Sequence, residues 1–299
     1  MAKKNEAIGI ALGSGGARGL AHVGVLEVLL ERGVKPEFVA GTSMGALVGA
    51  AYAAGRFDAL REAVAGLDVA DAASLFIDFE IGGAGLVKGE KVMAFFEKIV
   101  PDAPIESLPI PFAAMATDIA TGEAFLMSRG RLHHALRASI SIPGVFTPVR
   151  RGNRLLVDGG VSSPVPVEAA RDLGARRVLA VNVDGGPPCP YSTHRLPTVV
   201  NKAIGLGERV RDKIREELGR RTKPTRMGLV EMLMKTTRIC EDRIAQWEIE
   251  RSAPDWLLQP AVGDIPTLDF SRIDDAIQAG RDAASALVDA DDSNSLFIN

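Results

Sequence analysis

The sequence predicts an α/β protein in which helices cover both faces of a mostly parallel sheet, a three-layer α/β/α sandwich. Near the N-terminus, short apolar runs typical of buried strands alternate with longer runs of helical periodicity. The connections are short, which suits parallel strands joined by helices. We expect a single α/β domain over residues 1–299, in which residues 185–299 form a C-terminal helical region that completes or covers the core.

The first part of the chain supplies the order strand, helix, strand, helix. Glu6–Leu12 is an apolar run and predicts the first strand. Leu20–Arg32 carries leucine and valine on one helical face and stops at Gly33. Phe38–Thr42 predicts a second strand, and Met44–Ala54 predicts a helix rich in small residues. This order is the basis for expecting a parallel sheet.

The remaining elements follow from the same periodicities and from turn residues. We expect strands at Phe112–Asp118, Glu123–Ser128, Phe146–Val149, Arg154–Val157, Val178–Val183 and Asp255–Pro260. We expect helices at Leu60–Leu67, Glu90–Val100, Leu132–Ser139, Val167–Leu173, Val199–Arg221, Gly228–Glu250 and Phe270–Val288. A methionine-rich apolar stripe on the helix that begins at Gly228 is expected to be core, with an acyl channel, bilayer docking or a subunit contact as alternatives.

Composition excludes several classes of protein. The chain is 46% hydrophobic with a net charge of −3, so it can bury a core and gives no reason to expect nucleic acid. Cys189 and Cys240 lack the spacing of a zinc site or a disulfide framework and fit a reducing compartment. The near-apolar stretch Met44–Gly55 is shorter than the ~20 residues that span a bilayer. We therefore expect a cytoplasmic protein with no metal and no cofactor, whose surface is free to contact the inner face of the membrane peripherally.

A glycine-rich loop follows the first predicted strand, with Gly13, Gly15, Gly16 and Gly19 around Arg18. Backbone N–H groups at the start of a helix favour negative charge. A phosphate-binding P-loop would need a lysine followed by serine or threonine, and a dinucleotide-binding loop would need glycine at the position of Arg18. Two interpretations remain: the loop stabilises a charge that forms during a reaction, or its glycines serve packing alone.

The second motif is G41-T-S-M-G45, between a predicted strand and a predicted helix. This is the nucleophile-elbow pattern, in which a sharp turn presents the Ser43 hydroxyl at the carboxyl edge of the sheet. Glycines flank the serine because neighbouring Cβ atoms would clash in so tight a turn. The alternative is a glycine-rich turn into a close-packed helix.

A nucleophilic serine needs a base, which is usually a histidine held by a carboxylate. Of the four histidines, only His194 comes late in the chain, in a proline-rich loop. A triad esterase or thioesterase that uses His194 remains an alternative. A second candidate base is Asp158, which a predicted strand delivers into Gly159 and Gly160. Taken alone, that pattern is also typical of an ordinary turn.

Together the motifs resemble the patatin-like phospholipase family. A G-x-G-G-x-R-G loop follows the first strand, G-x-S-x-G follows the second, and V-D-G-G places Asp158 115 residues after Ser43. The segment Ala138–Pro148 is similar to a family segment whose proline, here Pro143, lies near the active site. The resemblance covers residues 8–168 and implies a catalytic region on the patatin-like variant of the hydrolase fold.

The resemblance also implies a mechanism. Family members cleave acyl esters of lipids with a serine–aspartate dyad and no histidine, which here would be Ser43 and Asp158. The N–H groups of Gly15, Gly16 and Ala17 would form an oxyanion hole. Arg18 would neutralise the oxyanion, bind a lipid phosphate, or hold the loop by a salt bridge. The supporting motif residues are Gly13, Gly19, Gly41, Gly45, Gly159, Gly160 and Pro143. Another alternative is a non-catalytic lipid-binding or regulatory protein on the same fold. The oligomeric state stays open.

Overall fold

The computed structural model describes residues 7–67, 75, 87–184 and 229–290. At the centre of this described part lies an eight-stranded sheet in the order β5-β6-β3-β2-β1-β7-β8, with β4 paired to β3. The strands are β1 (Ile8–Leu12), β2 (Phe38–Thr42), β3 (Phe112–Asp118), β4 (Ala124–Met127), β5 (Val149–Arg151), β6 (Arg154–Asp158), β7 (Arg177–Val181) and β8 (Trp256–Leu258). The pairs from β3 through β2, β1 and β7 to β8 are parallel, and those with β4, β5 and β6 are antiparallel.

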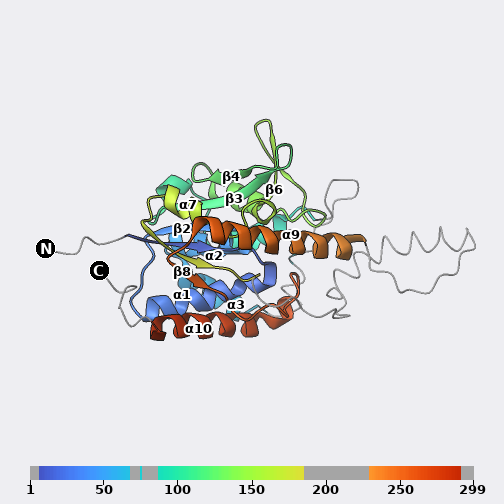
Figure 1. Ribbon diagram of the computed structural model, residues 1–299. Helices are drawn as coiled ribbons and strands as arrows, with labels where there is room; N and C mark the ends of the chain where they lie inside the picture. The colour runs from blue at the N-terminus through green and yellow to red at the C-terminus, as the bar shows by residue number, and fades with distance from the viewer. Residues whose placement is uncertain (1–6, 68–74, 76–86, 185–228, 291–299) are drawn as a thin grey trace, which may run out of the picture.

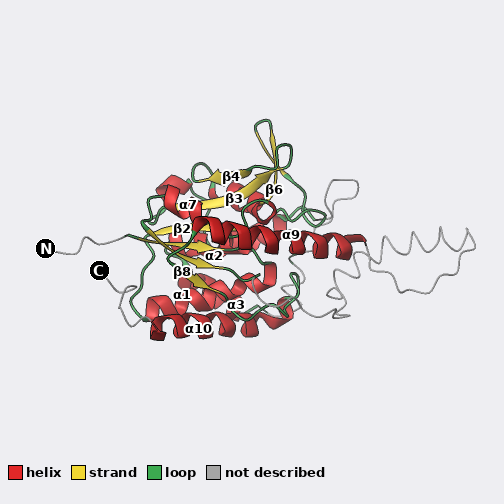
Figure 2. Cartoon of the chain, in the orientation of Figure 1, coloured by secondary structure: helices red, strands yellow, loops and turns green. Residues whose placement is uncertain are grey.

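Helices cover both faces of the sheet, as Figure 1 and Figure 2 show, with α1 and α10 on one side and α7 and α9 on the other. The α-helices are α1 (Ala21–Glu31), α2 (Met44–Ala53), α3 (Phe57–Ala65), α5 (Glu90–Ile99), α6 (Leu132–Ser139), α7 (Val167–Asp172), α9 (Leu229–Ser252) and α10 (Ile273–Ala290). The 3-10 helices are η1 (Gly16–Leu20), η2 (Ile105–Ser107), η3 (Gly159–Val161) and η4 (Phe270–Arg272). The predicted three-layer α/β/α architecture is confirmed.

The alternation of side chains along the strands produces the two packed layers. In β1, Ile10 and Leu12 join the apolar cluster formed with α1, α2 and α10. Ala11 points to the opposite face and joins the cluster that contains Ala245 of α9. The strands thus bury both faces, and each fully buried large side chain contributes roughly 1.5–3 kcal/mol to stability. This packing holds the carboxyl ends of β1 and β2, where the site lies.

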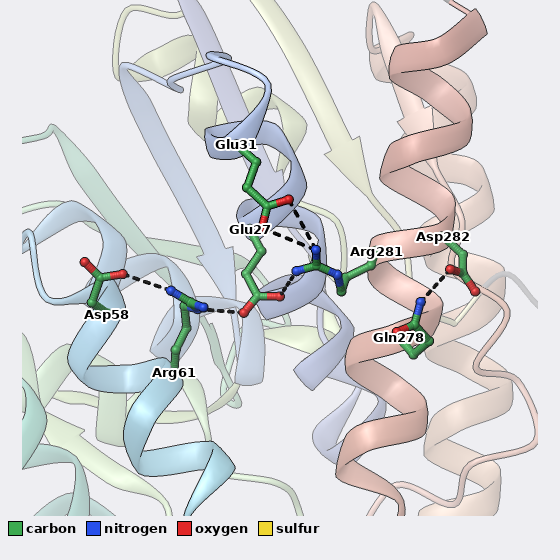
Figure 3. A network of polar contacts seen from close by, with 7 residues as sticks. All are labelled: Glu27, Glu31, Asp58, Arg61, Gln278, Arg281 and Asp282. Atoms are coloured by element: carbon green, nitrogen blue, oxygen red, sulfur yellow. Dashed lines mark hydrogen bonds and ion pairs between the residues drawn. The ribbon is translucent and has the colours of Figure 1, made fainter.

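An ion-pair network joins α1, α3 and α10 at the surface (Figure 3). Glu27 of α1 accepts from Arg61 of α3 at 2.6 Å and from Arg281 of α10 at 2.5 Å. Arg281 also reaches Glu31, and Arg61 reaches Asp58. Exposed pairs of this kind are each worth ~0.2–1 kcal/mol, so they orient the helices more than they stabilise them.

Some predicted boundaries are wrong. The strand expected at Phe146–Val149 begins only at Val149, because the Phe146 N–H bonds to the carbonyl of Ile142. The helix expected from Leu60 begins at Phe57, whose ring packs edge-on against Tyr52. The helix expected at 199–221 lies outside the described residues.

The sequence analysis expected the methionine-rich stripe of α9 to be core, but the structure exposes part of it. Met232, Leu233, Ile239 and Trp247 are exposed. Ala245 is fully buried on the opposite side of the helix. Apolar content predicted burial but could not tell which face of the helix meets the protein.

Candidate active site

Ser43 occupies a strained turn between β2 and α2. Its φ of 55° and ψ of −120° are unusual for a residue with a side chain, and in the described part only Ala253 shares a positive φ without being glycine. The turn is held by the Ser43 N–H, which donates to Ser139 Oγ at 2.9 Å. It also needs glycine at position 45, where a Cβ atom would lie 2.2 Å from the carbonyl oxygen of Leu12. This is the strand–turn–helix geometry of a nucleophile elbow.

Asp158 lies at the end of β6 and accepts a hydrogen bond from the Ser43 hydroxyl. Ser43 Oγ donates to Asp158 Oδ2 at 2.7 Å, and the Gly160 N–H donates to Asp158 Oδ1 at 2.8 Å. Both Ser43 and Asp158 are buried. Burial raises the pKa of Asp158 to about 7, the nearby Asp184 charge adds to this, and the hydrogen bonds from Gly160 and Ser43 oppose it. A carboxyl with this pKa is a stronger base than an ordinary aspartate.

The glycine-rich loop lies beside Ser43, but its donors differ from the expected set. The Ala17 N–H donates to the carbonyl of Thr267 at 2.8 Å, so the structure gives no support to the expectation that Ala17 serves an oxyanion. Gly15 and Gly16 line the cavity at Ser43, and no hydrogen-bond partner of their N–H groups is found within the described part of the chain. Their φ angles of 153° and 57° explain the need for glycine. The N–H groups of Gly15 and Gly16 therefore remain as the candidate hydrogen-bond donors to an oxyanion.

Arg18 points away from the site, into the protein. Its guanidinium forms an ion pair with Asp184 at 2.5 Å, and both side chains are 1% exposed. It also donates to the carbonyl of Ile265 and to Thr267 Oγ1, while Ser14 Oγ donates to the other oxygen of Asp184. Of the three roles considered for Arg18, this position supports the salt bridge that holds the loop and gives no support to the other two.

Replacing Arg18 with leucine should destabilise the protein by roughly 3–5 kcal/mol, because Asp184 would be left as a buried, unpaired charge. Urea unfolding measures the loss. The double variant Arg18→Leu with Asp184→Leu is the matched control and should recover most of the stability. A single variant that unfolds at the wild-type urea concentration would contradict this role.

The other motif residues support the turns by close backbone contacts. A Cβ atom at Gly41 would lie 2.5 Å from the carbonyl oxygen of Gly45, and one at Gly159 would lie 2.5 Å from that of Met115. Similar clashes at backbone or side-chain atoms apply to Gly13, Gly19 and Gly160. Pro143 follows Ile142, which lines the cavity.

A small cavity lies over Ser43 and Asp158, and α9 closes it. Its volume is about 20 Å³, which is room for about one water molecule. The α9 residues that line it are Met234, Thr237, Arg238 and Glu241. The sequence motifs did not reveal this contribution. Thr237 and Arg238 lie three and four residues after Met234, and Glu241 lies four and three residues after them. This helical spacing is the signal that places the four residues on one face.

Glu241 is a second carboxyl group at the site, and the sequence analysis missed it. A Cβ atom added to Gly160 would lie 2.8 Å from Glu241 Oε1 and 3.2 Å from Asp158 Oδ1. Both carboxyl groups therefore lie beside Gly160. Burial raises the pKa of Glu241 well above its ordinary value, and the charges of Asp158 and Asp184 add to this, while Arg18 and Arg238 oppose it. Burial and the two neighbouring carboxylates therefore favour the neutral form of this carboxyl more than in an ordinary glutamate.

No histidine lines the cavity within the described part of the chain. His22 is buried with Nε2 on the carbonyl of Gly13, and burial lowers its pKa to about 4. His133 and His134 contact the carbonyls of Val100 and Arg150. His194 lies outside the described residues.

Neither a metal site nor a membrane-spanning helix is found in the described ranges. No group of three or more His, Cys, Asp or Glu side chains there is arranged to hold a metal ion. Over the same ranges, no helix combines the length and the apolarity needed to cross a bilayer.

Comparison with known proteins identifies the family. The family model for patatin-like phospholipases matches residues 10–171, more than half of the chain. The chain belongs to the patatin-like phospholipase family, which confirms the resemblance found in its motifs.

Relatives among curated proteins are longer than this chain. An uncharacterised NTE family protein of Mycobacterium bovis is 42% identical over 183 residues, covering 61% of this chain and 51% of the relative. An uncharacterised NTE family protein of Mycobacterium tuberculosis is 33% identical over 292 residues, covering 95% of this chain and 47% of the relative. The chain thus spans about half the length of these relatives.

Among solved structures, the crystal structure of VipD from Legionella pneumophila is similar to this chain. The TM-score is 0.50 at 13% identity, and the match covers 95% of this chain and 67% of VipD. At this identity the likeness supports the fold alone.

Proposed function

We propose that this protein is a lipid acyl hydrolase in which Ser43 is the nucleophile and Asp158 the base. The observation that carries the proposal is the 2.7 Å hydrogen bond from Ser43 Oγ to Asp158 Oδ2 at a nucleophile elbow. Membership of the patatin-like phospholipase family supports an acyl ester of a lipid as the substrate. The raised pKa of Asp158 supports its role as a base near neutral pH.

In the first half of the reaction, Ser43 Oγ attacks the ester carbonyl and its proton passes to Asp158. The carbonyl oxygen becomes an oxyanion facing the N–H groups of Gly15 and Gly16. The positive end of α2, which starts at Met44, also favours negative charge here. The C–O bond then breaks, Asp158 returns the proton to the leaving alcohol or lysolipid, and an acyl-enzyme on Ser43 remains.

The second half of the reaction hydrolyses the acyl-enzyme. Asp158 takes a proton from water, whose oxygen attacks the acyl carbonyl and forms a second oxyanion at the same donors. Collapse breaks the bond to Ser43 Oγ, which recovers the proton from Asp158, and the fatty acid leaves. The cavity of about 20 Å³ suits this water but not an acyl chain, so α9 has to shift for a lipid to enter.

Gly16→Ala should lower kcat about 100- to 1,000-fold, the typical cost of losing one oxyanion donor. A Cβ atom there would lie 2.2 Å from the Thr267 carbonyl oxygen, so the loop must move. Gly33→Ala is the matched control: Gly33 also has a positive φ of 82°, but a Cβ atom there meets nothing within 4 Å. Steady-state kinetics should show unchanged kcat in the control. Equal losses in both variants would contradict the assignment.

The substrate class is tested by fatty-acid release from phospholipids, lysophospholipids and short acyl esters. Wild type is compared with His194→Ala, and the proposal predicts similar rates for both. Loss of activity in folded His194→Ala would support a histidine triad instead. No release from any substrate, with no labelling by a fluorophosphonate, would leave a lipid-binding protein on a hydrolase fold.

A further inference from the structure

Helix α9 has two faces of different character. Its inner face closes the cavity over Ser43 through Met234, Thr237, Arg238 and Glu241. The same face is held to the body of the protein by Glu248, which accepts hydrogen bonds from Ser163 Oγ at 2.5 Å and from the Val165 N–H at 2.8 Å. Figure 1 shows α9 running along one side of the sheet and extending past it.

The opposite face of α9 is exposed and combines apolar with basic side chains. At every fourth position stand five exposed residues, which we call the outer stripe: Lys235, Ile239, Arg243, Trp247 and Arg251. Ile239 is 64% exposed and Trp247 59%. The Arg251 guanidinium lies 5.3 Å from the centre of the Trp247 ring. Over residues 232–251, Glu250 is exposed and the other carboxyl groups, on Glu241, Asp242 and Glu248, are partly buried, whereas all three cations of the outer stripe are exposed.

A large exposed isoleucine and tryptophan on one helix face, beside the exposed Met232, are typical of a surface that contacts a partner or a membrane. The chemistry of the stripe selects what covers it. Lys and Arg side chains can extend their charges to headgroups while an isoleucine and an indole ring enter the boundary of the acyl chains. Each cation adds ~1 kcal/mol of attraction to an anionic leaflet. A neutral protein surface would use the apolar residues but not the cations.

We propose that the outer stripe of α9 binds an anionic lipid surface. This docking would place the Ser43 cavity about one helix diameter, on the order of 10 Å, from the lipid. Binding itself needs no catalysis, and only its purpose, delivery of a lipid to Ser43, rests on the proposed function. Because the helix that docks is also the helix that closes the cavity, docking and opening involve the same element.

Trp247 is a built-in probe of this docking. The chain has two tryptophans, and the other, Trp256, lies half-buried under the Arg177 guanidinium, 3.9 Å from it. Trp256→Phe leaves Trp247 as the only tryptophan of the full-length chain. Its fluorescence is titrated with vesicles of phosphatidylcholine alone and of phosphatidylcholine mixed with phosphatidylserine, with and without brominated acyl chains.

The proposal predicts a blue shift and bromine quenching of Trp247 with the anionic vesicles, and binding that weakens as salt rises. Ile239→Asp with Arg243→Glu should weaken binding at least tenfold. The matched control is Ile119→Asp with Arg56→Glu, which makes the same changes at exposed residues outside α9 and should bind like the parent. Hydrolysis of a short soluble ester is followed in all variants, so that loss of docking is distinguished from loss of catalysis.

Three results would overturn the proposal. The first is no change in Trp247 fluorescence with anionic vesicles. The second is equal loss of binding in the outer-stripe variant and its control. The third is a Trp247 emission that is already blue-shifted without lipid and that shifts to longer wavelength on dilution, while the molecular mass of the protein in solution falls. The outer stripe would then bind a second copy of this chain.

Discussion

Ser43→Ala should reduce fatty-acid release at least about a thousand-fold, because the proposed acyl-enzyme forms on this hydroxyl. The fold should survive, since alanine removes one atom and leaves the backbone hydrogen bond to Ser139 in place. Ser14→Ala is the matched control. Ser14 also lines the cavity, but its hydroxyl donates a hydrogen bond to Asp184 at 3.3 Å, and activity should stay within a few-fold of wild type. A Ser43→Ala enzyme that retains turnover would show that another group is the nucleophile.

Asp158→Asn should cause a loss of similar size, because the amide cannot take the proton of Ser43.

In the wild type, kcat/KM should rise with pH through about 7, where Asp158 ionises, and then level off. An ordinary aspartate would give this rise near pH 4. The pH profile of His194→Ala separates the alternatives: a rise that persists near 7 assigns it to Asp158, and one that disappears assigns it to the histidine.

Ionisation of Asp158, which should raise activity as pH rises, should lower the stability of the fold. The folded-state pKa of Asp158, about 7, lies above the ordinary value of 3.8, so its favourable contribution to stability is full below about pH 4 and is lost as pH rises through about 7. Above pH 7, Asp158→Asn should therefore be more stable than the wild type in urea, and the difference should close below pH 4. Glu241 and Glu248 are also raised but are present in both proteins. A variant that is less stable at high pH would contradict the burial of this charge.

The sequence predicted the elements whose chemistry is local. The G-x-S-x-G pattern lies between an apolar run and a helical run, so the turn at Ser43 could be expected from a few residues. The register of β6 against β3 brings Asp158 opposite Ala116 and close to Ser43, but no periodicity reports that pairing. Only resemblance to a family linked Asp158 to the serine.

The parts that sequence analysis missed depend on contacts between distant segments. The Ala17 donor is taken by Thr267, and Arg18 is paired with Asp184, 166 residues away. Glu241 comes over the site only because α9 packs along one side of the sheet and extends past it. A pattern of residue types cannot report such contacts, since each depends on how complete elements pack.

The most direct test of the central claim is to map a fluorophosphonate adduct by mass spectrometry of the intact protein and its peptides. The account predicts one adduct, on Ser43, which is absent in Ser43→Ala and forms much more slowly in Asp158→Asn, while His194→Ala labels like the wild type. An adduct on a different residue, or labelling of Ser43 that needs His194 and not Asp158, would contradict the serine–aspartate mechanism.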